Sequence, residues 1–250
     1  MTDWAHIKGI VFDLDDTLYP QESYKRSGFA VVAQWFARRY GLPYETTFDQ
    51  LEAIMRAKGP SYGYIFDDFA ELAGLNGGIV PELVEIFVRH EPKIDCFEGV
   101  LPMLARLNRK YKTGILTDGR ADVQRRKIRS LGLHHQVNAI RCSYASGQAK
   151  PDSRLYAWFE EQFQTPGRQL VYVGDNPKKD FPGAVKRNWK TVRVLTGEYA
   201  SKNLTADIKT DLCLNSVIDL ENFLNAPRDG CQRQTPQETQ IGRSPIESRR

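Results

Sequence analysis

Cysteine, long apolar runs and excess charge are all scarce in this 250-residue sequence. No apolar run approaches the roughly 20 residues that a membrane-spanning helix needs, which argues against a membrane protein. The segment Met1–Trp4 lacks the basic and apolar regions of a signal peptide, and we therefore expect a cytoplasmic protein. The four cysteines form no Cys-x-x-Cys pair and are expected to be reduced thiols: Cys96, Cys142, Cys213 and Cys231.

The charge balance argues against a nucleic-acid partner. The chain has 35 Lys and Arg against 31 Asp and Glu, a net charge of +4. Five arginines and three acids fall in residues 226–250, so this stretch carries +2 and the rest of the chain also carries +2. Domains that bind nucleic acid carry a concentrated basic surface. A body this close to neutral gives little support for such a partner, and we expect none.

Five short apolar runs predict buried strands. They are rich in β-branched residues and show little alternation, as expected of strands covered on both faces. Segments with helical spacing of apolar residues lie between them. Strand and helix in alternation are typical of an α/β protein with a doubly wound parallel sheet. The five runs are Ile7–Phe12, Thr113–Thr117, Ala139–Cys142, Leu170–Val173 and Thr191–Leu195.

A long interval separates the first predicted strand from the second. It holds about a hundred residues, far more than a βα connection requires, and helical patterns fill it. We therefore predict a small helical cap domain over residues 20–91, inserted into an α/β core of residues 1–19 and 92–225. The helical segments are Tyr24–Tyr40, Phe48–Ala57, Ile65–Ala73 and Val80–Arg89.

Residues 226–250 differ in composition from the rest of the chain. Gln, Arg, Pro, Ser and Thr are frequent there, and large apolar residues are almost absent. Such a stretch buries too little apolar surface to offset the entropy that is lost when a chain becomes ordered. The composition therefore predicts a disordered tail.

Polar and charged residues gather where the predicted strands end. In open parallel sheets, ligands bind beyond the carboxyl ends of the strands. The first, second and fourth strands each end in such residues, and a loop before a predicted helix adds a lysine. We expect these side chains to lie along one edge of the sheet. They are Asp13, Asp15, Thr117, Asp118, Lys150, Asp175 and Asp180.

Two of these acids are separated by a single residue. If the chain stays extended, the side chains of Asp13 and Asp15 point to the same side and repel each other. A cation relieves that repulsion, and Asp175 can supply a further oxygen. A few hard oxygen ligands, with room left for water and a phosphate, suit Mg²⁺. Lys150 and Thr117 would then face the phosphate oxygens, so the pattern indicates a magnesium and phosphate site.

Four segments resemble, in order, the motifs of the haloacid dehalogenase superfamily, of the phosphatase type. Asp13–Thr17 matches the first motif, Asp-x-Asp-x-Thr, and Thr117–Gly119 matches the second. Lys150-Pro151 matches the third, and Gly174–Asp180 matches the fourth, Gly-Asp-x-x-x-x-Asp. One such motif is weak, but four in order are specific. The resemblance covers residues 7–225 and implies a Rossmann-like core with a helical cap between the first two motifs.

The resemblance implies a role for each of these residues. Asp13 is then the nucleophile that forms an aspartyl-phosphate, and Asp15 protonates the leaving oxygen and later activates water. Asp15 needs a raised pKa for this, which a neighbouring carboxylate would provide. Thr117, with backbone N–H groups near Asp118, holds the phosphoryl group, and Lys150 neutralises its charge. The implied Mg²⁺ ligands are Asp13, the Asp15 backbone carbonyl and Asp175. Asp180 is then either a further ligand or a residue that contacts a ligand without binding the ion itself.

Several other residues have simpler structural interpretations. Asp16 is expected to form a turn, and Asp180 can also be read as a helix cap. The segment Pro60–Tyr64 either lines the substrate cavity or is a turn packed by its tyrosines. The histidines show no metal-ligand spacing, and we expect all four at the surface: His6, His90, His134 and His135.

The leading functional hypothesis is an Mg²⁺-dependent phosphatase acting on a small soluble phosphomonoester. The first motif and the Leu18–Pro20 segment after it slightly favour a nucleoside monophosphate over a sugar phosphate. A phosphosugar mutase would use the same residues. A 2-haloacid dehalogenase needs no acid two residues after the nucleophile, so Asp15 argues against it. A non-catalytic phosphate-binding module should have lost Asp13, Asp15, Lys150 or Asp175, and none is lost.

Overall fold

The computed structural model describes residues 4–201 and 210–226, so the tail predicted from residue 227 onward lies outside the described residues. In the described part of the chain, one fully parallel sheet has the strand order β3-β2-β1-β4-β5-β6. The first strand therefore lies in the middle of the sheet, as the doubly wound prediction requires. The strands are β1 (Gly9–Phe12), β2 (Lys112–Thr117), β3 (Ala139–Cys142), β4 (Leu170–Gly174), β5 (Lys190–Val194) and β6 (Leu212–Leu214).

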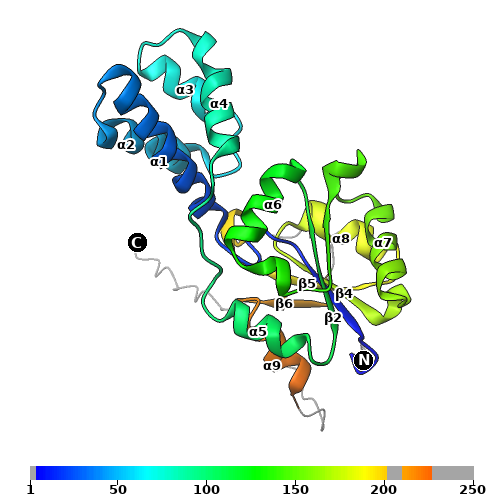
Figure 1. Cartoon of the computed structure of the whole chain (residues 1–250). Coiled ribbons are helices and arrows are strands. Elements are labelled where there is room, and N and C mark those ends of the chain that lie inside the picture. The colour runs from blue at the N-terminus through cyan, green and yellow to red at the C-terminus, as the bar shows by residue number, and fades with distance from the viewer. Residues whose placement is uncertain (1–3, 202–209, 227–250) are drawn as a thin grey trace, which may run out of the picture.

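Helices cover both faces of the sheet (Figure 1). Successive strand residues point to opposite faces, so Val11 packs with α7 and α8 whereas Ile10 and Phe12 pack with α5 and α9. The fold class predicted from the sequence is confirmed. The helices of the core are α5 (Val100–Leu107), α6 (Ala121–Ser130), α7 (Ser153–Phe163), α8 (Pro177–Val185) and α9 (Asp219–Asn225). Short 3-10 helices are η1 (Gly77–Ile79), η2 (Leu133–His135), η3 (Ser143–Ser146), η4 (Gly167–Gln169) and η5 (Gly197–Tyr199).

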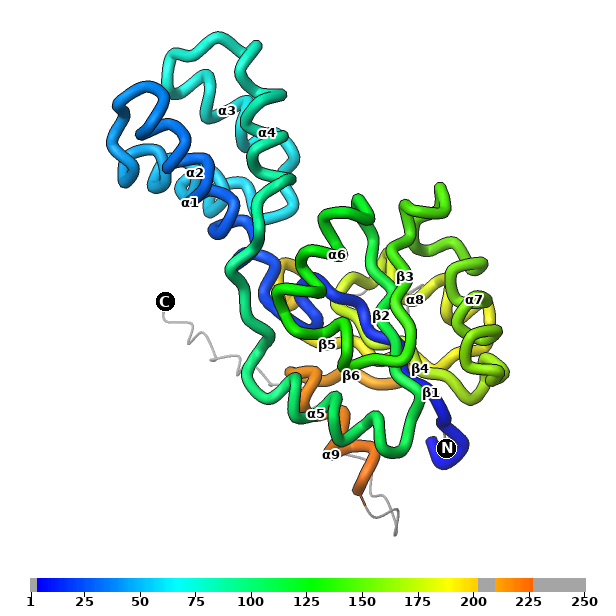
Figure 2. Tube along the Cα trace, in the orientation of Figure 1, coloured from blue at the N-terminus to red at the C-terminus, as the bar shows by residue number. Residues whose placement is uncertain are grey.

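Residues 20–91 of the long interval after β1 form four α-helices and the short helix η1, which lie apart from the sheet (Figure 2). Two connecting segments join these helices to the core, and the amide of Phe97 in one donates to the carbonyl of Leu18 in the other at 3.0 Å. Buried aromatic rings, among them Phe29, Phe66 and Phe87, fill the interior of the four helices. The helices are α1 (Gln21–Tyr40), α2 (Tyr44–Lys58), α3 (Ile65–Leu72) and α4 (Val80–Arg89).

Two expectations about individual residue types were tested by the fold. Among the described residues, Cys96, Cys142 and Cys213 are free thiols, whereas Cys231 lies outside them. His90 is buried, so the expectation of a surface histidine was wrong at this position. Its ring lies against Phe87 in the helical insert, and its Nδ1 lies within hydrogen-bond distance of the Phe87 carbonyl oxygen. None of the described helices combines the length and apolar character needed to cross a membrane.

Candidate active site

The end of β1 places Asp13 at the centre of the sheet edge. Its backbone amide donates to the carbonyl of Val173 at 2.8 Å, which continues the pairing of β1 with β4 by one residue. Its carboxylate is buried and forms an ion pair with Lys150 at 2.8 Å. The nucleophile expected from the sequence is therefore held rigidly beside a cation.

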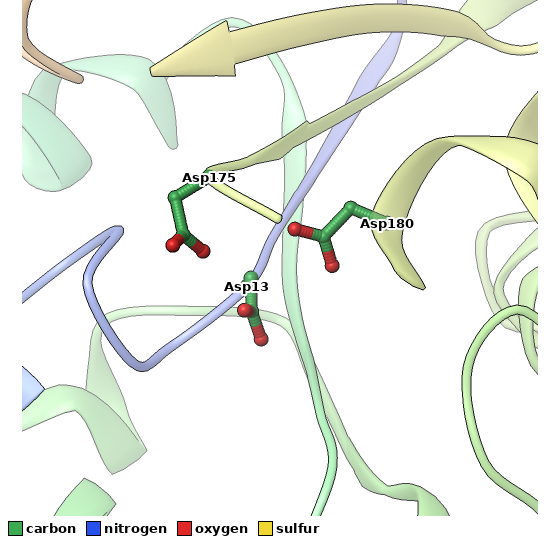
Figure 3. A group of neighbouring side chains, drawn as sticks. All are labelled: Asp13, Asp175 and Asp180. Carbon is green, nitrogen blue, oxygen red and sulfur yellow. The ribbon is translucent and has the colours of Figure 1, made fainter. Parts of the chain in front are cut away.

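Asp175 and Asp180 reach the same point from β4 and α8. Carboxylate oxygens of Asp13, Asp175 and Asp180 all lie within 4.8 Å of one another (Figure 3). Asp180 is fully buried and accepts hydrogen bonds from Lys150 Nζ at 2.7 Å and from the Asn176 amide at 2.8 Å. The strand ends thus bring together three of the four acids that the sequence associated with a metal.

Gly174 makes this close approach possible. A Cβ atom at this position would lie 2.3 Å from an Asp180 carboxylate oxygen. Any side chain would therefore displace the carboxylate that holds Lys150, and Lys150 in turn pairs with Asp13. The glycine that opens the fourth sequence segment is required by packing around the site.

Charge in this cluster is unbalanced. Three carboxyl groups face one ammonium group, so full ionisation would leave a double negative charge in a buried place. Burial and then the neighbouring carboxylates raise the pKa of Asp175 to about 9. Burial also raises the pKa of Asp13 to about 7, against the opposing effect of Lys150. Such a set of hard oxygen donors fits a divalent cation, which would relieve this repulsion.

Asp15 takes a different orientation from the one expected. Its carboxylate is not in the group with Asp13 and Asp175; it accepts hydrogen bonds from Lys127 Nζ at 2.7 Å, Gln124 Nε2 at 2.9 Å and the Tyr19 hydroxyl. The chain leaves the extended conformation after β1, so side-chain alternation no longer applies.

The charge state expected for Asp15 also differs. Burial pushes the pKa of Asp15 upward, but the charge of Lys127 and the three hydrogen bonds outweigh burial, and the pKa is lowered. The prediction of a pKa raised by a neighbouring carboxylate was wrong. No local sequence pattern indicated that a lysine from a distant helix would reach this acid.

The second strand end supplies Thr117 and Asp118. The buried Thr117 hydroxyl accepts a hydrogen bond from Gln124 Nε2. One carboxylate oxygen of Asp118 accepts from the Ser143 hydroxyl at 2.6 Å and from the Lys150 amide at 3.0 Å. Asp118 therefore also ties the end of β2, which carries Thr117, to the loop that carries Lys150.

Asp16 forms a turn, as expected. It has a φ of 53°, and its carboxylate accepts a hydrogen bond at 2.8 Å from the amide of Gln21, the first residue of α1. Its position is also fixed from the core, because the Thr196 hydroxyl donates to its carbonyl. The turn thereby sets the direction in which the chain leaves β1 for the helical insert.

A cavity of about 200 Å³ opens above the carboxylate cluster. Ser61 reaches it from the helical insert, and this residue belongs to the Pro60–Tyr64 segment for which two interpretations were open. Tyr62 instead bonds Asp68 at 3.1 Å, so the segment both lines the cavity and packs as a turn. The lining residues are Asp13, Asp15, Asp16, Gln21, Ser61, Thr117, Asp118, Lys150, Asp175, Asn176, Lys179 and Tyr199.

Sequence reasoning missed several residues of this site. Gln124 and Lys127 lie on α6, whose sequence offers several basic residues and no means of separating buried from exposed ones. Lys179 and Tyr199 line the cavity from α8 and η5. Lys179 lies within the fourth sequence segment, which is the one available signal for it.

Comparisons with known proteins identify the family of this chain. The family model described as Haloacid dehalogenase-like hydrolase matches residues 10–194. The glyceraldehyde 3-phosphate phosphatase of Methanocaldococcus jannaschii is 29% identical over 225 residues, 87% of this chain and 97% of its own. The phosphoserine phosphatase of Thermus thermophilus is 32% identical over 156 residues, 62% of this chain and 59% of its own.

Solved structures share the fold. The 2-haloacid dehalogenase from Pseudomonas syringae pv. Tomato matches with a TM-score of 0.61 at 23% identity, covering 87% of this chain and 98% of its own. At this identity the likeness shows the fold alone, since one fold hosts many reactions. The match to the family model is the stronger finding, because residues 10–194 include all four segments that resemble the family's motifs. This chain belongs to the family of haloacid dehalogenase-like hydrolases.

Proposed function

We propose that the chain is an Mg²⁺-dependent phosphatase that hydrolyses a small phosphomonoester through an aspartyl-phosphate intermediate on Asp13. The observation that carries this proposal is the position of the Asp13 carboxylate. It lies at the cavity, 2.8 Å from Lys150 Nζ and within 4.8 Å of carboxylate oxygens of Asp175 and Asp180. A nucleophile, a cation for the transferred charge and an acidic metal site thus meet at one point.

The first half-reaction forms a bond between an Asp13 carboxylate oxygen and phosphorus. The bond from phosphorus to the ester oxygen breaks, and that oxygen takes a proton from Asp15. Because the pKa of Asp15 is lowered in the free protein, its carboxylate first takes this proton from the bound phosphate monoanion. The Thr117 hydroxyl and the Lys150 ammonium stabilise the charge on the phosphoryl oxygens. In the second half-reaction, water attacks phosphorus while Asp15 accepts its proton, and inorganic phosphate and the free Asp13 carboxylate result.

The described acids fit a magnesium ion. Asp13 and Asp175 would hold it with their carboxylates, and Asp15 with its backbone carbonyl. Asp180 accepts hydrogen bonds from Lys150 and the Asn176 amide. We therefore propose that it does not bind the ion itself but fixes the position of Lys150. The ion, when bound, would neutralise charge on the phosphoryl group.

The substrate is proposed to be small. A cavity of about 200 Å³ suits a compact phosphate ester better than a bulky one. Two relatives are named for glyceraldehyde 3-phosphate and for phosphoserine, which are small phosphate esters. A nucleoside monophosphate or a sugar phosphate, the two classes favoured by the sequence, needs more room, which movement of the helical insert would have to provide.

We propose that residues 20–91 act as a cap over this cavity. Ser61 already lines the cavity from the insert, and the insert is joined to the core by two connecting segments. Closure of the cap would exclude water and add contacts to the leaving group.

Phosphate release from a panel of esters tests the proposed function. The panel holds three-carbon phosphates, phosphoserine, sugar phosphates and nucleoside monophosphates, each assayed with Mg²⁺ and with EDTA. We expect release that EDTA abolishes, and an Asp13→Asn variant that is inactive on every ester. Halide release from a 2-haloacid in the presence of EDTA, or isomerisation of a sugar phosphate without free phosphate, would overturn the proposal.

A further inference from the structure

Two side chains of α6, Gln124 and Lys127, reach the carboxylate of Asp15 from one side. Lys127 Nζ lies 2.7 Å from Oδ1, and Gln124 Nε2 lies 2.9 Å from Oδ2. The hydroxyl of Tyr19 also donates to Oδ1. Both oxygens of Asp15 are therefore engaged, and the carboxyl group cannot rotate without losing a donor.

Lys127 is an unusual lysine in its surroundings. Only 6% of its side chain is exposed, and its ammonium lies 4.2 Å from the ring centre of Tyr24 and 5.8 Å from that of Tyr19. Burying an ammonium group costs several kcal/mol unless a partner compensates it. Here Asp15 supplies the partner charge and the aromatic faces supply further attraction. An apolar residue would fill this space at lower cost, which suggests that Lys127 serves Asp15.

Gln124 joins the acid to the phosphate-binding hydroxyl. Its Nε2 lies within hydrogen-bond distance of Asp15 Oδ2, of Thr117 Oγ1 and of the Asp118 carbonyl. Because the Thr117 oxygen already accepts from Gln124, its own hydrogen is available to donate into the cavity. One amide group thus orients two side chains that would act on opposite sides of the same phosphorus–oxygen bond.

We propose that Lys127 and Gln124 are positioning residues that hold the Asp15 carboxyl group where it can exchange a proton with the ester oxygen. This role rests on the proposed phosphatase function. Proton transfer requires the two oxygens to approach within about 2.6–3.2 Å, so a carboxyl group free to rotate spends much of its time out of reach. Lys127 is the more specific of the two, because Gln124 also serves Thr117.

Lys127 also connects the acid to the helical insert. Tyr24, whose ring lies over the Lys127 ammonium, belongs to the second turn of α1. Beside Lys127 on α6, the Arg126 guanidinium donates to the carbonyl of Val88 near the end of α4. The position of Asp15 therefore depends on how the insert meets α6.

The test compares two esters that differ in their need for an acid. Glycerol phosphate releases a strongly basic alkoxide that must be protonated, whereas p-nitrophenyl phosphate releases a stable phenolate. We expect Lys127→Met to lower kcat/KM for glycerol phosphate by roughly 10- to 100-fold, and for p-nitrophenyl phosphate by no more than about threefold. The ratio kcat/KM reports the steps up to departure of the alcohol, in which the acid acts.

Three further variants sharpen the comparison. Arg129→Ala changes an exposed residue of the same helix and should leave both esters unaffected. In an Asp15→Asn background, Lys127→Met should cause little additional loss on glycerol phosphate, because its effect acts through Asp15. Should Lys127→Met fail to fold in a thermal unfolding experiment, Lys127→Gln carries the same expectation.

The outcomes separate this proposal from the one on which it rests. If the wild-type protein is active and Lys127→Met lowers kcat/KM equally for the two esters, the positioning role is overturned and the phosphatase function remains in place. A full additional loss in the Asp15→Asn background would overturn it as well. Wild-type protein that releases phosphate from neither these two esters nor the wider panel would overturn the phosphatase function and this role together.

Discussion

Asp118 follows β2 and lines the cavity, but one of its carboxylate oxygens already accepts hydrogen bonds from within the protein. It accepts from the Ser143 hydroxyl and from the backbone amide of Lys150, and so fixes the loop that carries Lys150. The resemblance assigned Asp118 to substrate binding through the backbone N–H groups near it. The geometry makes a second role available, in which it acts on the reaction through Lys150.

The two roles differ in what an amide substitution does. Asp118→Asn keeps an oxygen that can accept both hydrogen bonds, so we expect kcat to stay within about threefold of wild type. Asp118→Ala removes the acceptor and frees the Lys150 loop, which should lower kcat by about 10- to 100-fold, since small displacements of charged groups are costly in catalysis. Steady-state kinetics on one ester measures both. If Asp118→Asn is as damaging as Asp118→Ala, the negative charge itself is needed and loop fixation is the wrong explanation.

At the scale of elements, the packing of α1 against α4 depends on one glycine. A Cβ atom at Gly28 would lie 2.3 Å from the Phe87 ring. That ring cannot easily move away, because the rings of Tyr24, Phe29 and Phe66 surround it. Gly28 therefore permits the close approach of the two helices that join the insert to the core.

Two opposing effects decide the outcome of Gly28→Ala. Alanine in a helix interior is favoured over glycine by about 0.5–1 kcal/mol, whereas overpacking a filled core costs about 1–3 kcal/mol. We expect the clash to prevail and the free energy of unfolding to fall by about 1–2 kcal/mol, as measured by urea denaturation. Gly77→Ala, where a Cβ atom meets nothing within 4 Å, is the control and should not destabilise. A stabilised Gly28→Ala protein would show that Phe87 has room to move.

Element prediction succeeded where the apolar pattern was clear and failed where it was weak. Helical spacing in the insert predicted Val80–Arg89 with its observed bounds, because ten residues give a clear apolar stripe. The strand Leu212–Leu214 was missed because three half-exposed residues carry no periodicity. The helix Asp219–Asn225 was missed for a related reason, since seven residues make barely two turns.

For the whole molecule, the sequence predicted which strand ends would meet. Parallel strands carry their carboxyl ends to one edge, and this brings Asp13 and Asp175 together regardless of side-chain detail, whereas Lys150 reaches Asp13 from a loop. The orientation of Asp15 was not predictable in this way. It depends on a turn that ends the strand and on Lys127 from a helix more than a hundred residues away, and no local pattern connects them.

The buried carboxylates also make the stability of the whole protein depend on pH. In the metal-free folded protein, Asp13 and Asp175 hold their protons up to pKa values of about 7 and about 9, whereas the unfolded chain releases them near 3.8. Between these values the folded state binds more protons than the unfolded state, so stability falls as the pH rises. Each proton of difference changes the free energy of unfolding by about 1.4 kcal/mol per pH unit.

The melting temperature of the EDTA-treated protein should therefore be lower at pH 9 than at pH 6. Mg²⁺ should raise it at both values, and more at pH 9, because binding requires the carboxylates to be ionised and then removes their repulsion. Asp175→Asn, which lacks the more strongly shifted of these two carboxyl groups, should show a flatter pH dependence and a smaller effect of Mg²⁺. Thermal unfolding monitored by circular dichroism measures all three. A metal-free protein equally stable at both pH values would mean that solvent, rather than bound protons, reduces the repulsion between these carboxylates. The cation would then not be needed to balance their charge.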